Sequence, residues 1–228
     1  VKVVGLCDVD EEAIDVSAEK VERLSGDSPK GYKDYRELLA KEKPEIVIIA
    51  TPDHWHAIPV VEAARAKKDI YCEKPLSLTI REARGMADTV KKEGVIFQTG
   101  SQQRSECGGR FHRACELIRN GRIGEVKTVH VGVGGPSKDC DLPEQPTPKD
   151  ADWNTWLGPA PLRGYHEALC PKGVHGHYPA WRNYKPYSGG GMTDWGAHHF
   201  DIAQWGLGMD ESGPVEVHAP DGKDFKTL

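Results

Sequence analysis

The sequence lacks the features that would mark a membrane protein or a nucleic-acid-binding protein. No apolar run approaches the roughly 20 residues that a membrane-spanning helix requires. The formal net charge is -5, whereas binding to nucleic acid or to anionic lipid by charge requires a basic face. These absences leave a small molecule as the expected partner, with no nucleic acid and no membrane.

The sequence also lacks a cysteine pattern. Its six cysteines form no CxxC pair and no regular spacing, so neither a zinc ribbon nor a disulfide framework is predicted. A metal site would have to draw on Cys170, His175, His177, His198 and His199. No ligand spacing among these residues fixes such a site, and we predict none.

The chain has no initiating methionine, since Val1 already begins an apolar run. We therefore expect a fragment or a processed chain, and its localisation stays open because any targeting signal would lie outside it. Its 228 residues, 38% hydrophobic and 29% charged, favour a globular protein of two modest domains.

In the first hundred residues, short apolar runs alternate with stretches of helical spacing. The apolar runs predict strands at residues 1–9, 46–50, 69–72 and 95–99. The helical spacing predicts helices at residues 11–24, 34–41, 59–67 and 79–93. The β-branched run at 46–50 is expected to be a central strand covered on both faces. This alternation predicts a doubly wound parallel sheet, an α/β fold, in a first domain of residues 1–100.

The chain changes in character after Gly100, where a second domain of residues 101–228 is expected. A helix is predicted at 109–120, followed by an apolar run at 126–133 and a proline-rich, polar stretch at 134–160. Residues 152–187 are rich in tryptophan, glycine and proline, a composition typical of packed lids and pocket walls. A final helix is predicted at 192–205.

Acidic residues follow the first apolar run, at Asp8 and Asp10. In a dinucleotide-binding fold, an acid at the end of the second strand hydrogen-bonds the adenosine ribose, and Asp8 stands where that acid is expected. A carboxylate there repels the 2'-phosphate of NADP, so NAD is favoured. The glycine-rich phosphate loop that should precede this strand is absent, and we expect it upstream of Val1. The alternative is that Asp8 only caps the following helix.

A polar segment with Thr51, Pro52 and His56 follows the 46–50 strand. It stands at the edge of the sheet where open α/β folds bind ligands, which favours a functional role. A turn held by aromatic packing is the alternative.

A charged pair, Glu73 and Lys74, follows the 69–72 strand and precedes Pro75. Desolvating such a pair is costly unless another group offsets the cost. A lysine in this position can donate a hydrogen bond to a reacting oxygen. A surface ion pair is the alternative.

Asp194 and His198 are four residues apart on the predicted final helix and therefore share one face. A carboxylate bonded to one imidazole nitrogen fixes the tautomer and leaves the other nitrogen free to act as a general base. His199 and Asp201 are expected to point elsewhere on the helix.

In this order, the motifs resemble those of the Gfo/Idh/MocA oxidoreductases. The motifs are the strand that ends in Asp8, Ala50-Thr51-Pro52 with His56, Glu73-Lys74-Pro75 and Asp194-x-x-x-His198. The resemblance implies an amino-terminal Rossmann-type domain followed by an α+β domain with a large, mostly antiparallel sheet. That sheet should be incomplete here because the chain stops at Leu228, and a sheet without a central strand leaves apolar surface exposed.

The resemblance also implies roles for particular residues. The catalytic residues would be Lys74, Asp194 and His198. The cofactor-binding residues would be Asp8, Thr51, Pro52, His56, Glu73, Lys74 and Gln102. Trp181, Arg182 and His199 would line the sugar pocket, although Arg182 can instead pair with a carboxylate of the second domain.

These roles predict an NAD-dependent oxidoreductase that transfers a hydride between the cofactor and a sugar or polyol. A homo-oligomer is expected for the full-length protein. One alternative is a sugar hydrolase or lyase that oxidises its substrate transiently with bound NAD. Another is a non-catalytic NAD-binding protein, against which the presence of Lys74, Asp194 and His198 speaks.

Overall fold

The computed structural model describes residues 1–149, 151–172 and 178–218. His175 and His177, which a metal site would have needed, lie outside this part of the chain. The chain divides into two compact units. Unit 1 comprises residues 1–101 and 133–197, and unit 2 comprises residues 102–132 and 198–228. No described helix is long and apolar enough to cross a membrane.

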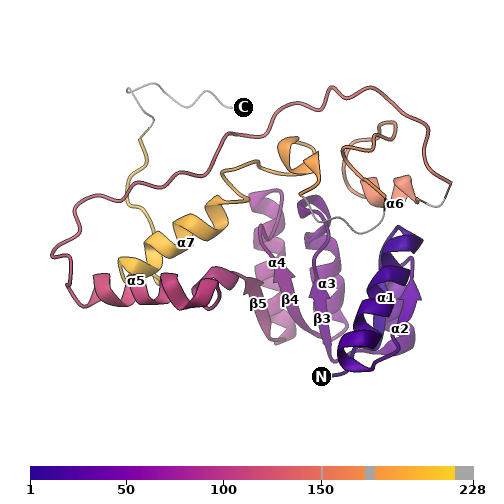
Figure 1. Cartoon of the computed structure of the whole chain (residues 1–228), viewed down its shortest axis with the longest axis horizontal. Coiled ribbons are helices and arrows are strands. Elements are labelled where there is room, and N and C mark those ends of the chain that lie inside the picture. The colour runs from indigo at the N-terminus through magenta and orange to yellow at the C-terminus, as the bar shows by residue number, and fades with distance from the viewer. Residues whose placement is uncertain (150, 173–177, 219–228) are drawn as a thin grey trace. The chain divides into compact units, whose positions relative to one another are not determined.

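Unit 1 contains two parallel sheets that share no ladder within the described residues. In the first sheet, β1 (Gly5–Cys7) pairs with β2 (Lys30–Tyr32). The second sheet consists of β3 (Ile46–Ile49), β4 (Asp69–Glu73) and β5 (Phe97–Gly100), in that order (Figure 1). The predicted parallel, Rossmann-type arrangement is confirmed.

Helices alternate with these strands, as predicted. They are α1 (Glu11–Ser25), α2 (Tyr35–Glu42), α3 (Ala57–Arg65) and α4 (Ile80–Glu93). Their ends follow from local chemistry, since Thr79 and Glu82 form a capping box at the start of α4 and Gly94 ends it with a φ of 68°. The sequence places the helix boundaries within a few residues of those observed.

Strand β2 has no counterpart among the predicted strands, because Lys30, Gly31 and Tyr32 form no apolar run. Its place is set by tertiary packing. A Cβ atom added to Gly31 would lie 2.6 Å from Cγ2 of Ile14 on α1, so the helix packs against the bare backbone of the strand.

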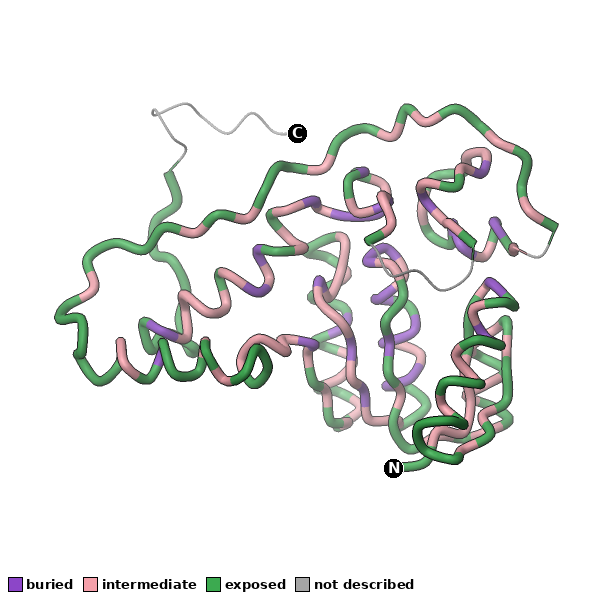
Figure 2. The backbone as a smooth tube through the Cα atoms, in the orientation of Figure 1, coloured by how far each residue is buried: buried purple, intermediate pink, exposed green. Residues whose placement is uncertain are grey.

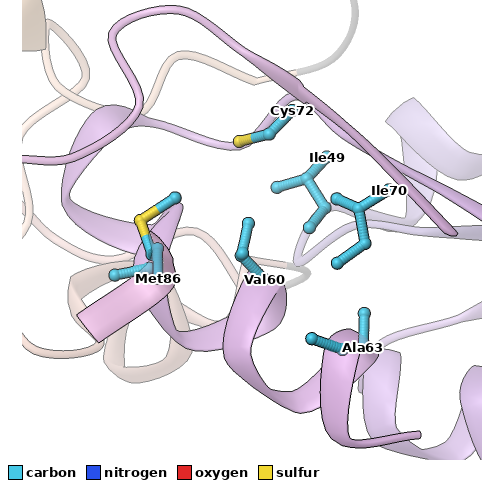
Figure 3. Packing of buried hydrophobic residues seen from close by; sticks show 8 residues of the cluster. Ile49, Val60, Ala63, Ile70, Cys72 and Met86 are labelled. Carbon is cyan, nitrogen blue, oxygen red and sulfur yellow. The ribbon is translucent and has the colours of Figure 1, made fainter. Parts of the chain in front are cut away.

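The aliphatic core of unit 1 lies between α3, α4 and one face of the β3–β5 sheet (Figure 3). Ile49, Ile70 and Cys72 point from the sheet towards Val60, Ala63 and Met86, and each of these six side chains is buried. Because side chains alternate along a strand, their sequence neighbours face the other way.

The opposite face of this sheet is not covered, which corrects the prediction for residues 46–50. Ile46 and Ile48 of β3 are 52% and 73% exposed. The physical reason is that α3 and α4 pack on the Ile49 side of the strand, and Figure 2 shows where buried and exposed stretches of the backbone lie.

A second, aromatic core in unit 1 is built mainly from irregular chain and the short helix α6 (Trp153–Leu157). Trp153 stacks on Trp156 with 4.8 Å between ring centroids, and Tyr165 meets Trp153 edge-on. Its buried members are Trp153, Trp156, Leu157, Tyr165, Leu169, Trp181, Tyr184 and Tyr187. The predicted aromatic wall at residues 152–187 is therefore a packed cluster.

Unit 2 contains α5 (Arg110–Arg119), the 3-10 helix η2 (Gln102–Arg104) and most of α7 (Gly196–Gly206). Arg104 binds both carboxylate oxygens of Asp201, at 2.8 and 2.7 Å, and its guanidinium lies 5.2 Å from the Trp205 ring centroid. After β5 the described residues form isolated bridges and no strand, so the apolar run at 126–133 is not part of a sheet.

Candidate active site

Lys74 and Asp194, 120 residues apart in sequence, form an ion pair in unit 1. Lys74 Nζ donates to Asp194 Oδ1 and, at 3.1 Å, to the Asp194 carbonyl oxygen. Their side chains are only 17% and 14% exposed, so Lys74 is not part of a surface ion pair. The structure thus brings together two of the three residues predicted to be catalytic.

Asp194 lies in the turns that precede α7, because this helix begins at Gly196 and not at Met192 as predicted. The Asp194 amide donates to Gly190 O at 2.9 Å, within the glycine-rich turn. We predicted that Asp194 and His198 share one face of a helix. Asp194 lies before the first residue of α7, so this part of the prediction is wrong. His198 is buried and belongs to unit 2, and the prediction that Asp194 orients it stays a prediction.

Arg182 is the second cation near Asp194, with Nε 3.9 Å from Asp194 Oδ2. Its guanidinium lies 4.2 Å from the Trp181 ring centroid and 5.1 Å from that of Tyr178, which fixes its plane. The carboxylate contact agrees with the alternative stated for Arg182. Its role and that of Trp181 in a sugar pocket stay predictions.

The sequence analysis missed Asp53, a buried carboxylate in the 51–56 segment. Asp53 is 4% exposed. Burial raises the pKa of its carboxyl to about 6; a hydrogen bond from Ser188 opposes the rise, and the negative charge of Asp194 adds to it. Arg182 and Lys74 favour its ionised form. The position of Asp53 directly after Thr51-Pro52 was the one sequence signal that could have marked it as a site residue. Its partner Ser188 is distant in sequence, so the contact between them could not be predicted.

His56 links the 51–56 segment to the segment that carries Lys74. Its Nδ1 donates to Pro75 O at 2.6 Å, and the ring is fully buried. Burial lowers the pKa of this imidazole, so it is neutral at neutral pH. The peptide bond between Lys74 and Pro75 is cis. The hydrogen bond from His56 holds the Pro75 carbonyl, next to Lys74, and the predicted contact of His56 with a cofactor stays a prediction.

His54 fits the alternative of a turn held by aromatic packing. It lies 5.1 Å from the Trp156 ring centroid and 5.2 Å from that of Tyr187, and its Nε2 donates to Trp156 O at 3.0 Å. Burial lowers its pKa to about 4. Thr51 is exposed and Pro52 half-buried at the end of β3.

Asp8 lies exposed just after β1, and its Oδ1 accepts a hydrogen bond from the Asp10 amide at 3.0 Å. The N-cap of α1 is Asp10, whose Oδ1 accepts from the Glu12 amide at 3.0 Å. The alternative role of helix cap therefore belongs to Asp10. Asp8 is left accessible at the end of its strand, as a ribose-binding carboxylate needs to be.

Gln102 and His199, also predicted site residues, belong to unit 2. Gln102 begins η2, and His199 Nδ1 lies 3.2 Å from Gly132 O. Their predicted contacts with nicotinamide and sugar stay predictions. Glu73 ends β4, next to Lys74.

The residues at the carboxyl ends of β1, β3 and β4 fit a dinucleotide. Asp8 offers an acceptor for a ribose, and parallel sheets bind nucleotides at this edge. Asp53 Oδ2, His54 Nδ1 and His56 Nε2 are buried polar atoms without a hydrogen-bond partner in the described part of the chain. Among the described residues, no group of three or more His, Cys, Asp or Glu side chains is arranged to hold a metal ion.

Comparison with known proteins agrees with this geometry. Residues 1–101 match the NAD-binding Rossmann fold of the Gfo/Idh/MocA oxidoreductases, and residues 134–225 match the carboxyl-terminal α/β domain of the same family. The chain belongs to this family.

Individual relatives share between a quarter and about a third of their residues with this chain over the aligned parts. The chain is 32% identical over 108 residues to a myo-inositol 2-dehydrogenase of Thermotoga maritima, which covers 47% of this chain and 32% of that protein. It is 35% identical over 98 residues to a 2,7-anhydro-N-acetylneuraminate hydratase of Escherichia coli, covering 43% and 26%. A crystal structure of an oxidoreductase domain protein from Kribbella flavida superposes with a TM-score of 0.56 at 25% identity, covering 91% of this chain and 45% of that one. This Gfo/Idh/MocA chain thus spans less than half the length of these relatives.

Proposed function

We propose that the full-length protein is an oxidoreductase that transfers a hydride between NAD and a hydroxyl-bearing carbon of a sugar or polyol. The observation that carries this proposal is the partly buried Lys74–Asp194 ion pair at the carboxyl end of β4. In a family with an NAD-binding Rossmann fold, this edge of the sheet is where cofactor and substrate meet. The myo-inositol 2-dehydrogenase relative supports a polyhydroxylated substrate.

In the proposed mechanism, Lys74 donates a hydrogen bond to the reacting oxygen and stabilises the negative charge that develops on it. Asp194 holds the ammonium in place before substrate arrives, so little reorganisation is needed during the reaction. His56 contributes by fixing the backbone beside Lys74 through its bond to Pro75.

His198 is assigned the role of general base, taking the proton from the substrate hydroxyl. Bound NAD would supply the hydride acceptor. Asp8 would hold the adenosine ribose through its exposed carboxylate, which favours NAD over NADP. Thr51, Pro52, Glu73 and Gln102 would contact the cofactor, while Trp181, Arg182 and His199 would bind the sugar.

The proposal is tested with the full-length protein. Mass spectrometry of the purified protein should detect bound nicotinamide dinucleotide, and a screen of sugars and polyols should produce NADH absorbance. Absence of both dinucleotide binding and NADH formation across the screen would contradict the proposal.

A second function has support from the hydratase relative. A lyase or hydrolase that oxidises its sugar and then returns the hydride would release product without net formation of NADH. Chromatographic detection of altered sugar in a reaction without NADH accumulation would favour this function. A non-catalytic NAD-binding protein would bind the dinucleotide but would produce neither NADH nor an altered sugar.

A further inference from the structure

Residues 188–194 of unit 1, here termed the glycine turn, carry Asp194 to the Lys74 side chain. Three consecutive glycines lie in the middle of this turn. The amides of Thr193 and Asp194 both donate to Gly190 O, at 3.1 and 2.9 Å. The position of the Asp194 carboxylate therefore depends on where the backbone of the glycine turn is held.

The middle of the glycine turn packs against residues 133–137. Gly190 forms an antiparallel bridge with Pro136, and the Gly191 amide donates to Gly135 O at 2.9 Å. A Cβ atom on Gly190 would lie 2.3 Å from a backbone nitrogen of this segment, and the φ of Gly190 is 69°. Because glycine has no side chain, the two backbones can approach this closely. The middle of the turn is thus held by backbone contacts alone.

The start of the glycine turn is held by a side chain, that of Ser188. Ser188 is 1% exposed, and its Oγ accepts a hydrogen bond from the Gly190 amide at 3.4 Å. A hydroxyl has one hydrogen to donate, and Ser188 donates it to the Asp53 carboxylate. This bond links the glycine turn to Asp53, which lies in a distant part of the sequence.

Asp53 is itself placed by the β3–β5 sheet. It begins the 3-10 helix η1 (Asp53–Trp55), which follows β3. Strand β3 pairs directly with β4, and Ile49 lies opposite Cys72. Lys74 comes two residues after Cys72. Asp53 and Lys74 therefore follow two paired strands, and the hydrogen bonds between these strands set the spacing of their backbones.

The glycine turn is consequently attached to this sheet at both of its ends. Asp53 binds Ser188 at the start of the turn, and Lys74 binds Asp194 at its end. The charges agree with this arrangement, since Lys74 and Arg182 favour the ionised form of Asp53 and also lie next to Asp194. Both carboxylates are thus close to the same two cations.

We infer that Asp53 is a positioning residue for Lys74. Through Ser188 it holds the start of the glycine turn, and the turn presents Asp194 to the Lys74 ammonium. The importance of Lys74 for the reaction rests on the proposed function, whereas the position of its ammonium does not. Because Asp53 acts through Asp194, its substitution should change the placement of Lys74 and leave NAD affinity unchanged.

The first test measures how accessible Lys74 is in the full-length protein. Lysines are methylated with formaldehyde and a borane reductant at about pH 8, where Asp53 is ionised because its pKa is about 6, and peptide mass spectrometry gives each rate. Asp53→Asn replaces a charged acceptor by a neutral one and should raise the rate at Lys74 roughly threefold to fivefold. Ser188→Ala removes the bond and should raise it roughly tenfold.

Two controls accompany this measurement. Asp152→Asn alters the same kind of bond at the exposed cap of α6, where the Thr155 hydroxyl donates to Asp152 Oδ2 at 2.6 Å. This variant should methylate Lys74 within about twofold of the wild-type rate. Lys41 is exposed on α2 and serves as an internal control, because its rate should be the same in all of these proteins.

The second test measures kcat with a sugar or polyol found in the screen. Asp53→Asn and Ser188→Ala should lower kcat by factors similar to those for methylation, with unchanged NAD affinity by calorimetry. When Asp194→Asn is already present, neither substitution should lower kcat further by more than about twofold, because the path through Asp194 is already broken. A purely structural role would lower kcat equally in both backgrounds.

The outcomes separate this inference from the proposed function. Unchanged methylation of Lys74 in both variants would overturn the inference, and so would an equal rise at Lys41, which would indicate general loosening. An equal loss of kcat with and without Asp194 would also overturn it. If no sugar or polyol yields NADH, the proposed function fails, whereas the methylation rates still decide whether Asp53 positions Lys74.

Discussion

The two cores of unit 1 differ in how they are built and in what they do. The aliphatic core uses small and branched side chains from regular elements, such as Val60, Ala63 and Ile70. The aromatic core uses tryptophan and tyrosine from irregular chain, and buried polar groups such as His54 lie against it. The two cores therefore differ both in composition and in the kind of chain that builds them.

The largest expected effect is on activity, from Lys74→Met. Removal of the ammonium should lower kcat roughly 10²- to 10³-fold, because one preorganised donor at the reacting oxygen is lost. NAD binding should persist, as calorimetry can check. The control is Lys41→Met, whose exposed pair with Glu37 lies on the surface of α2 and should leave kcat unchanged. A kcat near wild type for Lys74→Met would refute the assigned role.

The next effect is on stability, from Ile70→Ala in the aliphatic core. Ile70 is 3% exposed, and the cavity left by its truncation should cost about 2 to 5 kcal/mol of unfolding free energy. Denaturant titration measures this cost, and NAD affinity of the folded variant should not change. Ile96→Ala removes the same atoms from an exposed position and should cost less than about 0.5 kcal/mol. Equal costs for the two variants would contradict the assignment of Ile70 to the core.

A smaller, pH-dependent effect is expected from Asp53→Asn. The folded-state pKa of about 6 lies above the unfolded value, so the folded protein binds this proton more tightly. The corresponding stability is fully present below pH of about 4 and is lost as the pH rises through about 6. Asparagine does not titrate and keeps the size of the side chain.

The Asp53→Asn substitution should therefore stabilise the protein relative to wild type more at pH 7 than at pH 4, by up to about 3 kcal/mol. Melting curves of the two proteins at both pH values provide the measurement. His54, with a pKa lowered to about 4, titrates in the same range but is present in both proteins, so its contribution cancels. A difference that does not depend on pH would contradict the raised pKa of Asp53.

The regular part of unit 1 could be predicted from the sequence. Apolar runs and helical spacing depend on local sequence, so the strands of the β3–β5 sheet and helices α1 to α5 lie where expected. Strand β2 was missed because its position depends on the packing of Gly31 against Ile14 of α1, and no local sequence pattern predicts that contact. The exposed Ile48 face was missed because coverage depends on which helices are present, not on the strand's own composition.

The irregular part was less predictable. Motifs singled out Lys74, Asp194 and Asp8, whose roles stay predictions, whereas Asp53 was missed because its partners Ser188, Asp194 and Arg182 are distant in sequence. The link from Trp156 O to His54 and Trp55 was also missed, since it joins residues about a hundred positions apart through a backbone carbonyl that any residue carries.

Whether the Lys74–Asp194 pair acts at the reacting oxygen can be decided by following the hydride itself. A sugar or polyol found in the screen would be deuterated at the reacting carbon and mixed with NAD and the full-length protein, and the NADH analysed by mass spectrometry. We expect deuterium in NADH from the wild type and a rate at least about 10²-fold lower from Lys74→Met and Asp194→Asn, with NAD still bound. Transfer at the wild-type rate by either variant would contradict the proposed role of the pair.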